Sequence, residues 1–151
     1  MTEQVLTARL FPELGRRQSP RPFGILVVDD ELGVRALLEI WLRKQGFAVW
    51  LAAGGQEALT LYRNDLESID LVLLDLRMPG MDGAQTLAAL QELNSSVCTC
   101  FMSEDTGHYT AEHLRELGAA AILPKPFRLG EVAQVLRQKL AGRLDLSYAG
   151  D

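Results

Sequence analysis

The sequence has little of several features that mark specialised protein classes. Its 151 residues include two cysteines and two histidines, too few for a disulfide framework or for a structural zinc site, which usually takes four ligands. No apolar run approaches the roughly 20 residues of a membrane span. The stretch from Met1 to Gly24 lacks the apolar core of a signal peptide. We therefore expect a cytoplasmic protein that does not enter the membrane.

Positive charge is also scarce. Fifteen Lys and Arg face twenty Asp and Glu, a net charge of −5, so the chain as a whole is not drawn to nucleic acid or anionic membranes. The length fits one domain. We expect a flexible N-terminal extension over residues 1–23, one domain over 24–141, and a tail over 142–151 too short for a DNA-binding module. The extension is either a disordered leader or a docking segment.

The two cysteines, Cys98 and Cys100, fall in one apolar run that reads as a strand. Residues two apart on a strand point to the same face, and free cysteines are commonly buried. We expect both side chains to pack in the core.

From residue 23 onward, short apolar runs alternate with amphipathic stretches. The predicted strands cover 25–28, 47–51, 69–74, 97–102 and 119–123. The predicted helices cover 31–45, 55–64, 83–93, 110–117 and 129–140. The first helix carries its apolar stripe at Val34, Leu37, Leu38, Trp41 and Leu42. This alternation predicts an α/β fold with a parallel sheet covered on both faces, whose ligands bind at the carboxyl ends of the strands.

The strand ends carry the chemistry. Asp29 and Asp30 follow the first strand, Asp75 the third, Ser103 the fourth and Lys125 the fifth. Three carboxylates at one edge repel one another unless a cation joins them. Mg²⁺ prefers such oxygen ligands and commonly shares its shell with a phosphate. One carboxylate could then act as a nucleophile that becomes an aspartyl-phosphate, while the lysine and the serine hold the phosphoryl oxygens.

With these residues in place, the sequence resembles the receiver domain of two-component response regulators over roughly residues 23–141. The matching stretches are Val27-Val28-Asp29-Asp30-Glu31, the run from Leu73 through Asp75 to Gly83, Met102-Ser103, and Lys125-Pro126-Phe127. The resemblance implies a doubly wound, flavodoxin-like fold of five parallel strands in the order 2-1-3-4-5, with five helices. It also implies that the Lys125–Pro126 peptide bond is cis.

The resemblance assigns a role to each site position. Asp75 corresponds to the phosphoacceptor, Asp30 to a direct Mg²⁺ ligand, and Asp29 to an acid that acts largely through water. The backbone carbonyl of Arg77 corresponds to the third protein ligand of the metal. Ser103 corresponds to the hydroxyl residue that follows the phosphoryl group, and Lys125 to the lysine that pairs with its oxygens.

Two positions near the site depart from the family pattern or modify it. Receivers often carry Tyr or Phe where this chain has Ile122, so an aromatic ring cannot report activation from that position. The output could instead run through the loop from Glu104 to Tyr109. Arg77 and Asp105 flank the site with opposite charges, and they either pair to restrict water or act as two separate solvated charges.

The site residues are compatible with three functions. The first, a phosphorylation-dependent switch, is favoured because all five site positions are filled. The second is a receiver-like binding module that does not use phosphate. The third is a phosphohydrolase, which is disfavoured because Arg77 stands where such enzymes have a second acid.

The partners also follow from the resemblance. It implies a signalling protein rather than a turnover enzyme, of the stand-alone type seen in chemotaxis. The phosphoryl donor would be a sensor histidine kinase or a phosphotransfer protein, and the target an unknown protein. No direct DNA binding is expected, and homodimer formation is left open.

Overall fold

The computed structural model describes residues 21–104 and 109–149. Within them, five parallel strands form one sheet in the order β2-β1-β3-β4-β5, as the resemblance implies. The strands are β1 (Gly24–Val28), β2 (Ala48–Ala52), β3 (Leu71–Asp75), β4 (Thr99–Ser103) and β5 (Ala119–Pro124). From β1 the chain adds β2 on one side and β3 on the other. The carboxyl ends of β1 and β3 therefore meet where the strand order reverses, which is where such sheets bind ligands.

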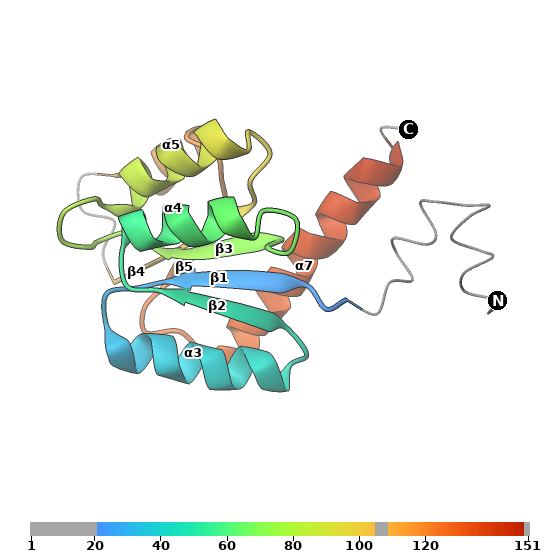
Figure 1. The fold of residues 1–151 in the computed structure, drawn as a ribbon, viewed down its shortest axis with the longest axis horizontal. Helices are drawn as coiled ribbons and strands as arrows, with labels where there is room; N and C mark the ends of the chain where they lie inside the picture. Colours follow the sequence, from blue (N-terminus) through green and yellow to red (C-terminus); the bar gives the residue numbers. More distant parts are fainter. Residues whose placement is uncertain (1–20, 105–108, 150–151) are drawn as a thin grey trace.

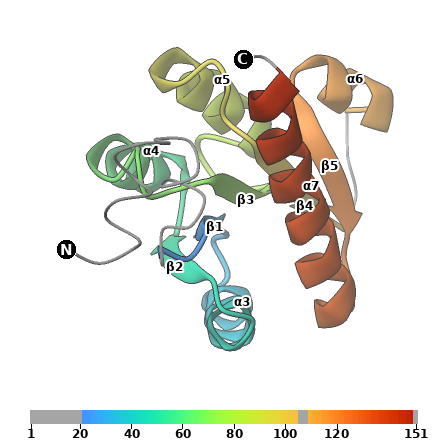
Figure 2. The same ribbon diagram turned by 90° about the vertical axis from the view of Figure 1, so that its right-hand side faces the viewer.

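Helices cover both faces of this sheet (Figure 1, Figure 2). On one face lie α3 (Leu32–Lys44) and α7 (Leu129–Ala149), which are joined where the Trp41 indole N–H donates to the Leu129 carbonyl over 3.0 Å. On the other lie α4 (Gly55–Asn64), α5 (Gly83–Leu93) and α6 (Ala111–Glu116). None of the helices in the described ranges is both long and apolar enough to cross a membrane.

The hydrophobic core is split by the sheet into two clusters. One lies beneath α3 and α7 and the other beneath α4, α5 and α6, so β1, β3 and β4 are buried along their whole length. Cys98 and Cys100 are buried in the first cluster, as predicted. Burial, together with the neighbouring Cys98, raises the pKa of the Cys100 thiol to about 12. This thiol is therefore unreactive in the folded protein.

Two predictions about the helices are wrong in detail. Leu37 belongs to the predicted apolar stripe of the first helix, but it is 51% exposed, whereas Leu38 and Leu42 of the same stripe are buried. The last helix was expected to end at Leu140, yet α7 continues to Ala149. Gly142, where the predicted tail begins, lies inside this helix, since one glycine inside a helix costs only about 1 kcal/mol relative to alanine. The domain limits of 24 and 141 stay predictions.

The turn into α5 brings two backbone segments unusually close. Asp82 caps this helix, since its side chain accepts from the Gln85 backbone N–H while the Gln85 side chain accepts from the Asp82 N–H. At the next residue, Gly83, a Cβ atom would lie 2.6 Å from the Asp75 carbonyl oxygen and 2.7 Å from Leu76 Cα. Only glycine fits there without a backbone shift.

A pair of glycine substitutions tests this close packing. Gly83→Ala should lower the free energy of unfolding by about 2 kcal/mol, because the added methyl group must displace backbone. Gly33→Ala in α3, where a Cβ meets nothing within 4 Å, should raise it by up to about 1 kcal/mol through helix propensity. Urea denaturation measures both, and similar values for the two variants would contradict the packing.

Candidate functional site

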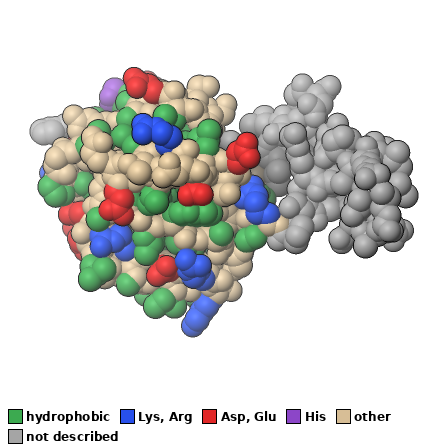
Figure 3. All heavy atoms as spheres, viewed as in Figure 1, with side chains coloured by type: hydrophobic (Ala, Val, Ile, Leu, Met, Phe, Trp, Pro, Cys, Tyr) green, Lys and Arg blue, Asp and Glu red, His purple; other side chains and the backbone are tan. Residues whose placement is uncertain are grey.

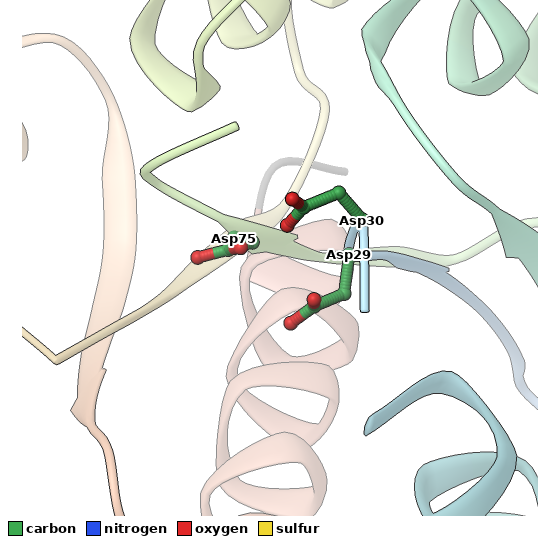
Figure 4. A group of neighbouring side chains, drawn as sticks. All are labelled: Asp29, Asp30 and Asp75. Carbon is green, nitrogen blue, oxygen red and sulfur yellow. The ribbon is translucent and has the colours of Figure 1, made fainter. Parts of the chain in front are cut away.

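Three carboxylates meet at the carboxyl end of the sheet, as the strand ends predicted. Asp29 and Asp30 follow β1, Asp75 ends β3, and these two strands are neighbours. One carboxylate oxygen from each residue lies within 4.8 Å of the other two (Figure 4). Asp29 and Asp75 are buried whereas Asp30 is exposed, so the cluster is open to solvent on the Asp30 side.

Lys125 brings a positive charge into this cluster from the end of β5. Its Nζ lies 2.7 Å from Asp29 Oδ2 and 3.6 Å from Asp75 Oδ1. Its backbone N–H donates to the Ser103 carbonyl over 2.8 Å, and the Lys125–Pro126 peptide bond is cis, as expected. The sequence placed Lys125 at the correct edge but did not reveal that its nearest carboxylate is Asp29.

Asp29 is held at its backbone as well as at its carboxylate. Its N–H donates to the Ala52 carbonyl over 3.1 Å, and its Oδ1 accepts from the Glu31 N–H over 2.9 Å. Its own carbonyl oxygen accepts from Arg35 Nη1 over 2.7 Å. Sequence reasoning missed Arg35. Helical side chains lean toward the helix N-terminus, so an arginine early in the helix after an acidic pair was the available signal.

The charges of the site shift its proton affinities. Burial, and after it the charge of Asp29, raise the pKa of Asp75 to about 6, although the charge of Lys125 opposes the shift. Burial lowers the pKa of Lys125, but the hydrogen bond and charge of Asp29 outweigh this, and the net pKa is raised. Two buried acids and an exposed one share one lysine, an excess of negative charge that a cation would neutralise. Three carboxylates fit a hard divalent cation such as Mg²⁺.

The raised pKa of Asp75 predicts how stability depends on pH without metal. Between the ordinary value of 3.8 and about 6, the folded state binds more protons than the unfolded state, so stability falls as pH rises. Asp75→Asn removes this ionisation. In EDTA the variant should match the wild type at pH 4 and exceed its free energy of unfolding by about 2–3 kcal/mol at pH 7. Urea denaturation across this range measures the difference, and a constant difference would contradict it.

A cavity of about 240 Å³ opens over the acids, and its lining brings the other predicted residues together. The lining residues are Asp30, Glu31, Asp75, Arg77, Ser103, Glu104 and Lys125. Ser103 ends β4 and is buried, while the Arg77 backbone N–H donates to Asp75 Oδ1 over 3.4 Å. Asp105 lies outside the described residues, so its pairing with Arg77 stays a prediction.

The position that departs from the family pattern lies beside the core. Ile122 and Tyr109 are both partly buried against the cluster beneath α4, α5 and α6. The Tyr109 hydroxyl donates to Asp82 Oδ2 over 3.3 Å, and its ring stacks on His113 with centroids 6.0 Å apart. Tyr109 thus connects the segment before α6 to the cap of α5. Residues 105–108 lie outside the described ranges, so an output route through 104–109 stays a prediction.

Comparison with known proteins agrees with this geometry. The family model of the response regulator receiver domain matches residues 25–137. Sporulation initiation phosphotransferase F of Bacillus subtilis is 34% identical over 116 residues, which cover 77% of this chain and 92% of that protein. Transcriptional regulatory protein PrrA of Mycobacterium leprae is 38% identical over 126 residues, which cover 83% of this chain but 52% of PrrA. The chain therefore spans about half the length of that regulator.

The fold is also shared with solved structures. One is a chain of the CheX–CheY complex with BeF₃ and Mg²⁺ from Borrelia burgdorferi, similar at a TM-score of 0.76 and 28% identity, covering 81% of this chain and 92% of that one. The family model spans both the acidic cluster and Lys125. Sequence, strand order and site therefore agree: the chain belongs to the response regulator receiver family.

Proposed function

We propose that this chain accepts a phosphoryl group on Asp75 from a phosphohistidine donor, in a Mg²⁺-dependent reaction, and that the added charge switches a protein-interaction surface. One observation carries the proposal. Asp75 presents its carboxylate beside two further acids, with the Lys125 ammonium 3.6 Å away, in a cavity open to solvent. A nucleophile, a cation site and an oxyanion partner are thus assembled in one place.

The residues support each part of the transfer. An Asp75 oxygen attacks phosphorus, the phosphorus–nitrogen bond to the donor breaks, and its electron pair leaves with the imidazole. With a pKa of about 6, Asp75 is mostly ionised at neutral pH and able to attack. The Lys125 ammonium then turns from Asp29 toward one phosphoryl oxygen, and the Ser103 hydroxyl donates a hydrogen bond to another phosphoryl oxygen.

The metal would be held by the carboxylates of Asp30 and Asp75 and by the backbone carbonyl of Arg77, with Asp29 acting through water. Mg²⁺, when bound, supplies positive charge to the phosphoryl oxygens. Asp29 and Asp75 are both buried, and their negative charges repel each other. This excess of negative charge supports such a ligand set.

Beryllofluoride, a mimic of an acyl phosphate, tests the proposal. Amide spectra recorded with Mg²⁺, before and after beryllofluoride is added, should change at Asp75, Ser103 and Lys125 and along β5 and α6. A protein that binds Mg²⁺ but shows no change with beryllofluoride would instead be the phosphate-independent binding module.

The donor-binding surface is part of the same proposal. On α3 the side chains of Leu32, Leu37 and Ile40 are 72%, 51% and 57% exposed, and hydrophobic side chains reach the surface over α3, at the bottom of Figure 3. An apolar groove lined partly by Leu37, Pro126 and Phe127 leads from this helix to Lys125. A sensor histidine kinase or phosphotransfer protein docked here would bring its histidine to Asp75, and its own apolar residues would cover the exposed side chains of α3.

Leu37→Asp should separate docking from chemistry. We expect transfer from a phosphohistidine donor to slow at least about 10-fold, because a charge replaces an apolar contact. Phosphorylation by acetyl phosphate, which needs no docking, should be unchanged. Leu66→Asp, a substitution at a leucine that is 39% exposed outside α3, is the matched control. Equal effects of the two variants on the donor reaction would rule out α3 as the docking surface.

The net charge of the chain bears on its target and its location. A net charge of −5 disfavours direct contact with DNA phosphates, so we propose a protein target and a cytoplasmic location. A homodimer formed on phosphorylation is the other form of output. Size-exclusion chromatography with and without beryllofluoride distinguishes the two.

A further inference from the structure

Arg35 contacts the acidic pair through the backbone. Its Nη1 donates to the Asp29 carbonyl oxygen over 2.7 Å, a short charge-assisted hydrogen bond. We propose that Arg35 is a positioning residue for the cation site, which holds the turn between β1 and α3 so that the carboxylates of Asp29 and Asp30 both face Asp75. This inference rests on the proposed function, since it concerns the same site.

The turn depends on such a contact because α3 begins without a capping side chain. Glu31 occupies the N-cap position but makes no side-chain hydrogen bond to the helix, so the usual device that fixes a helix entry is missing. Two hydrogen bonds to Asp29 fix it instead. The Glu31 N–H donates to Asp29 Oδ1, and Arg35 holds the Asp29 carbonyl from the helix side.

The carbonyl held by Arg35 belongs to the peptide group that links Asp29 to Asp30. A peptide group is planar, so fixing its oxygen also fixes the direction in which the Asp30 Cα lies. Asp30 is exposed, and burial does little to orient it. Arg35 therefore sets the geometry of both acids, although it lies outside the lining of the acidic cavity.

Charge and positioning predict opposite results when Arg35 is replaced. Removing a cation near three carboxylates should, by Coulomb's law alone, strengthen the binding of Mg²⁺. Removing a group that orients the ligands should weaken it, typically by about 10- to 100-fold. The sign of the change in Mg²⁺ affinity therefore shows whether Arg35 acts through its charge or by positioning the ligands.

Calorimetric titration of the full chain with Mg²⁺ provides the test. We expect Arg35→Ala to weaken Mg²⁺ binding by about 10-fold or more, and Arg35→Lys, which keeps a charged donor, to recover to within about 3-fold of the wild type. Arg43→Ala is the matched control. Arg43 lies on the same helix and also donates to a backbone carbonyl, that of Val49 over 3.2 Å. It does not contact the acidic cluster of Asp29, Asp30 and Asp75.

Each outcome decides the question. Wild-type or tighter Mg²⁺ binding by Arg35→Ala overturns the inference, as does equal weakening by Arg43→Ala. A loss of unfolding free energy with no rescue of Mg²⁺ binding by lysine would show a merely structural role. If the alanine variant does not fold, Arg35→Met keeps the packing of the side-chain stem and should show the same weakening. Failure of the wild type itself to bind Mg²⁺ would instead overturn the proposed function.

Discussion

Asp75→Asn should abolish the labelling of this protein by acetyl phosphate in the presence of Mg²⁺. The amide that replaces the carboxylate is a poor nucleophile, and the other two acids, Asp29 and Asp30, are expected to bind the metal rather than attack phosphorus. We expect at least about a 100-fold lower rate of phosphorylation, a conservative figure beside losses recorded when other catalytic nucleophiles are removed. Mass spectrometry of the intact protein detects the added phosphoryl group.

Asp70→Asn is the control for this experiment. Asp70 precedes the same strand but lies at the opposite end of the sheet, where it pairs with Arg21 over 3.0 Å and accepts from the Gly24 N–H over 2.7 Å. Its loss should leave labelling at the wild-type rate. Undiminished labelling of Asp75→Asn would place the nucleophile on a different residue.

Lys125→Met should cause the largest change in stability at the site. In metal-free buffer it leaves the fully buried Asp29 without its cation at 2.7 Å, and it removes the positive charge 3.6 Å from Asp75. Breaking a buried ion pair by deleting one partner typically costs about 3–5 kcal/mol. We expect the free energy of unfolding to fall by about 3 kcal/mol in EDTA at pH 7.

Added Mg²⁺ should recover much of that loss, because it replaces the missing positive charge and binds only the folded state. Lys44→Met, at an exposed lysine in the last turn of α3, should change the free energy of unfolding by no more than about 0.5 kcal/mol. Urea denaturation of both variants, in EDTA and in Mg²⁺, makes the measurement. A loss at Lys125 as small as that at Lys44 would mean that the acids are held by contacts other than this lysine.

The sequence predicted the architecture well because each strand of a parallel sheet reads as a short apolar run. The runs of β1, β3, β4 and β5 also end at or beside a polar or charged residue. Asp29, Asp75 and Ser103 were placed by that logic alone. The order of the strands required the family resemblance, since apolar runs do not say which strands pair. The limits of β1 to β5 differ from the predicted ones by a residue or two, because hydrogen bonding, not hydropathy, decides where a strand ends.

Long-range pairings could not be predicted. Lys125 contacts Asp29, which lies 96 positions earlier in the chain. From the sequence alone, its side chain could equally have pointed to Asp75. The exposure of Leu37 was missed because it lies at the edge of the apolar stripe of α3. The sequence does not show how far the contact between helix and sheet extends around the helix. Arg35 was missed because its partner is a backbone carbonyl. Every residue has such a carbonyl, so neither composition nor periodicity indicates which one a side chain contacts.

The hydrogen bond from the Trp41 indole to the Leu129 carbonyl gives the protein an intrinsic optical probe. This indole lies where α3 contacts the start of α7, and α7 begins shortly after Lys125 in the chain. The second tryptophan, Trp50, lies beside Gly24 at the amino end of the sheet. In a Trp50→Phe variant, the fluorescence would come from Trp41 alone. Its emission wavelength would then follow, in real time and without an added label, any rearrangement that phosphorylation transmits to that junction.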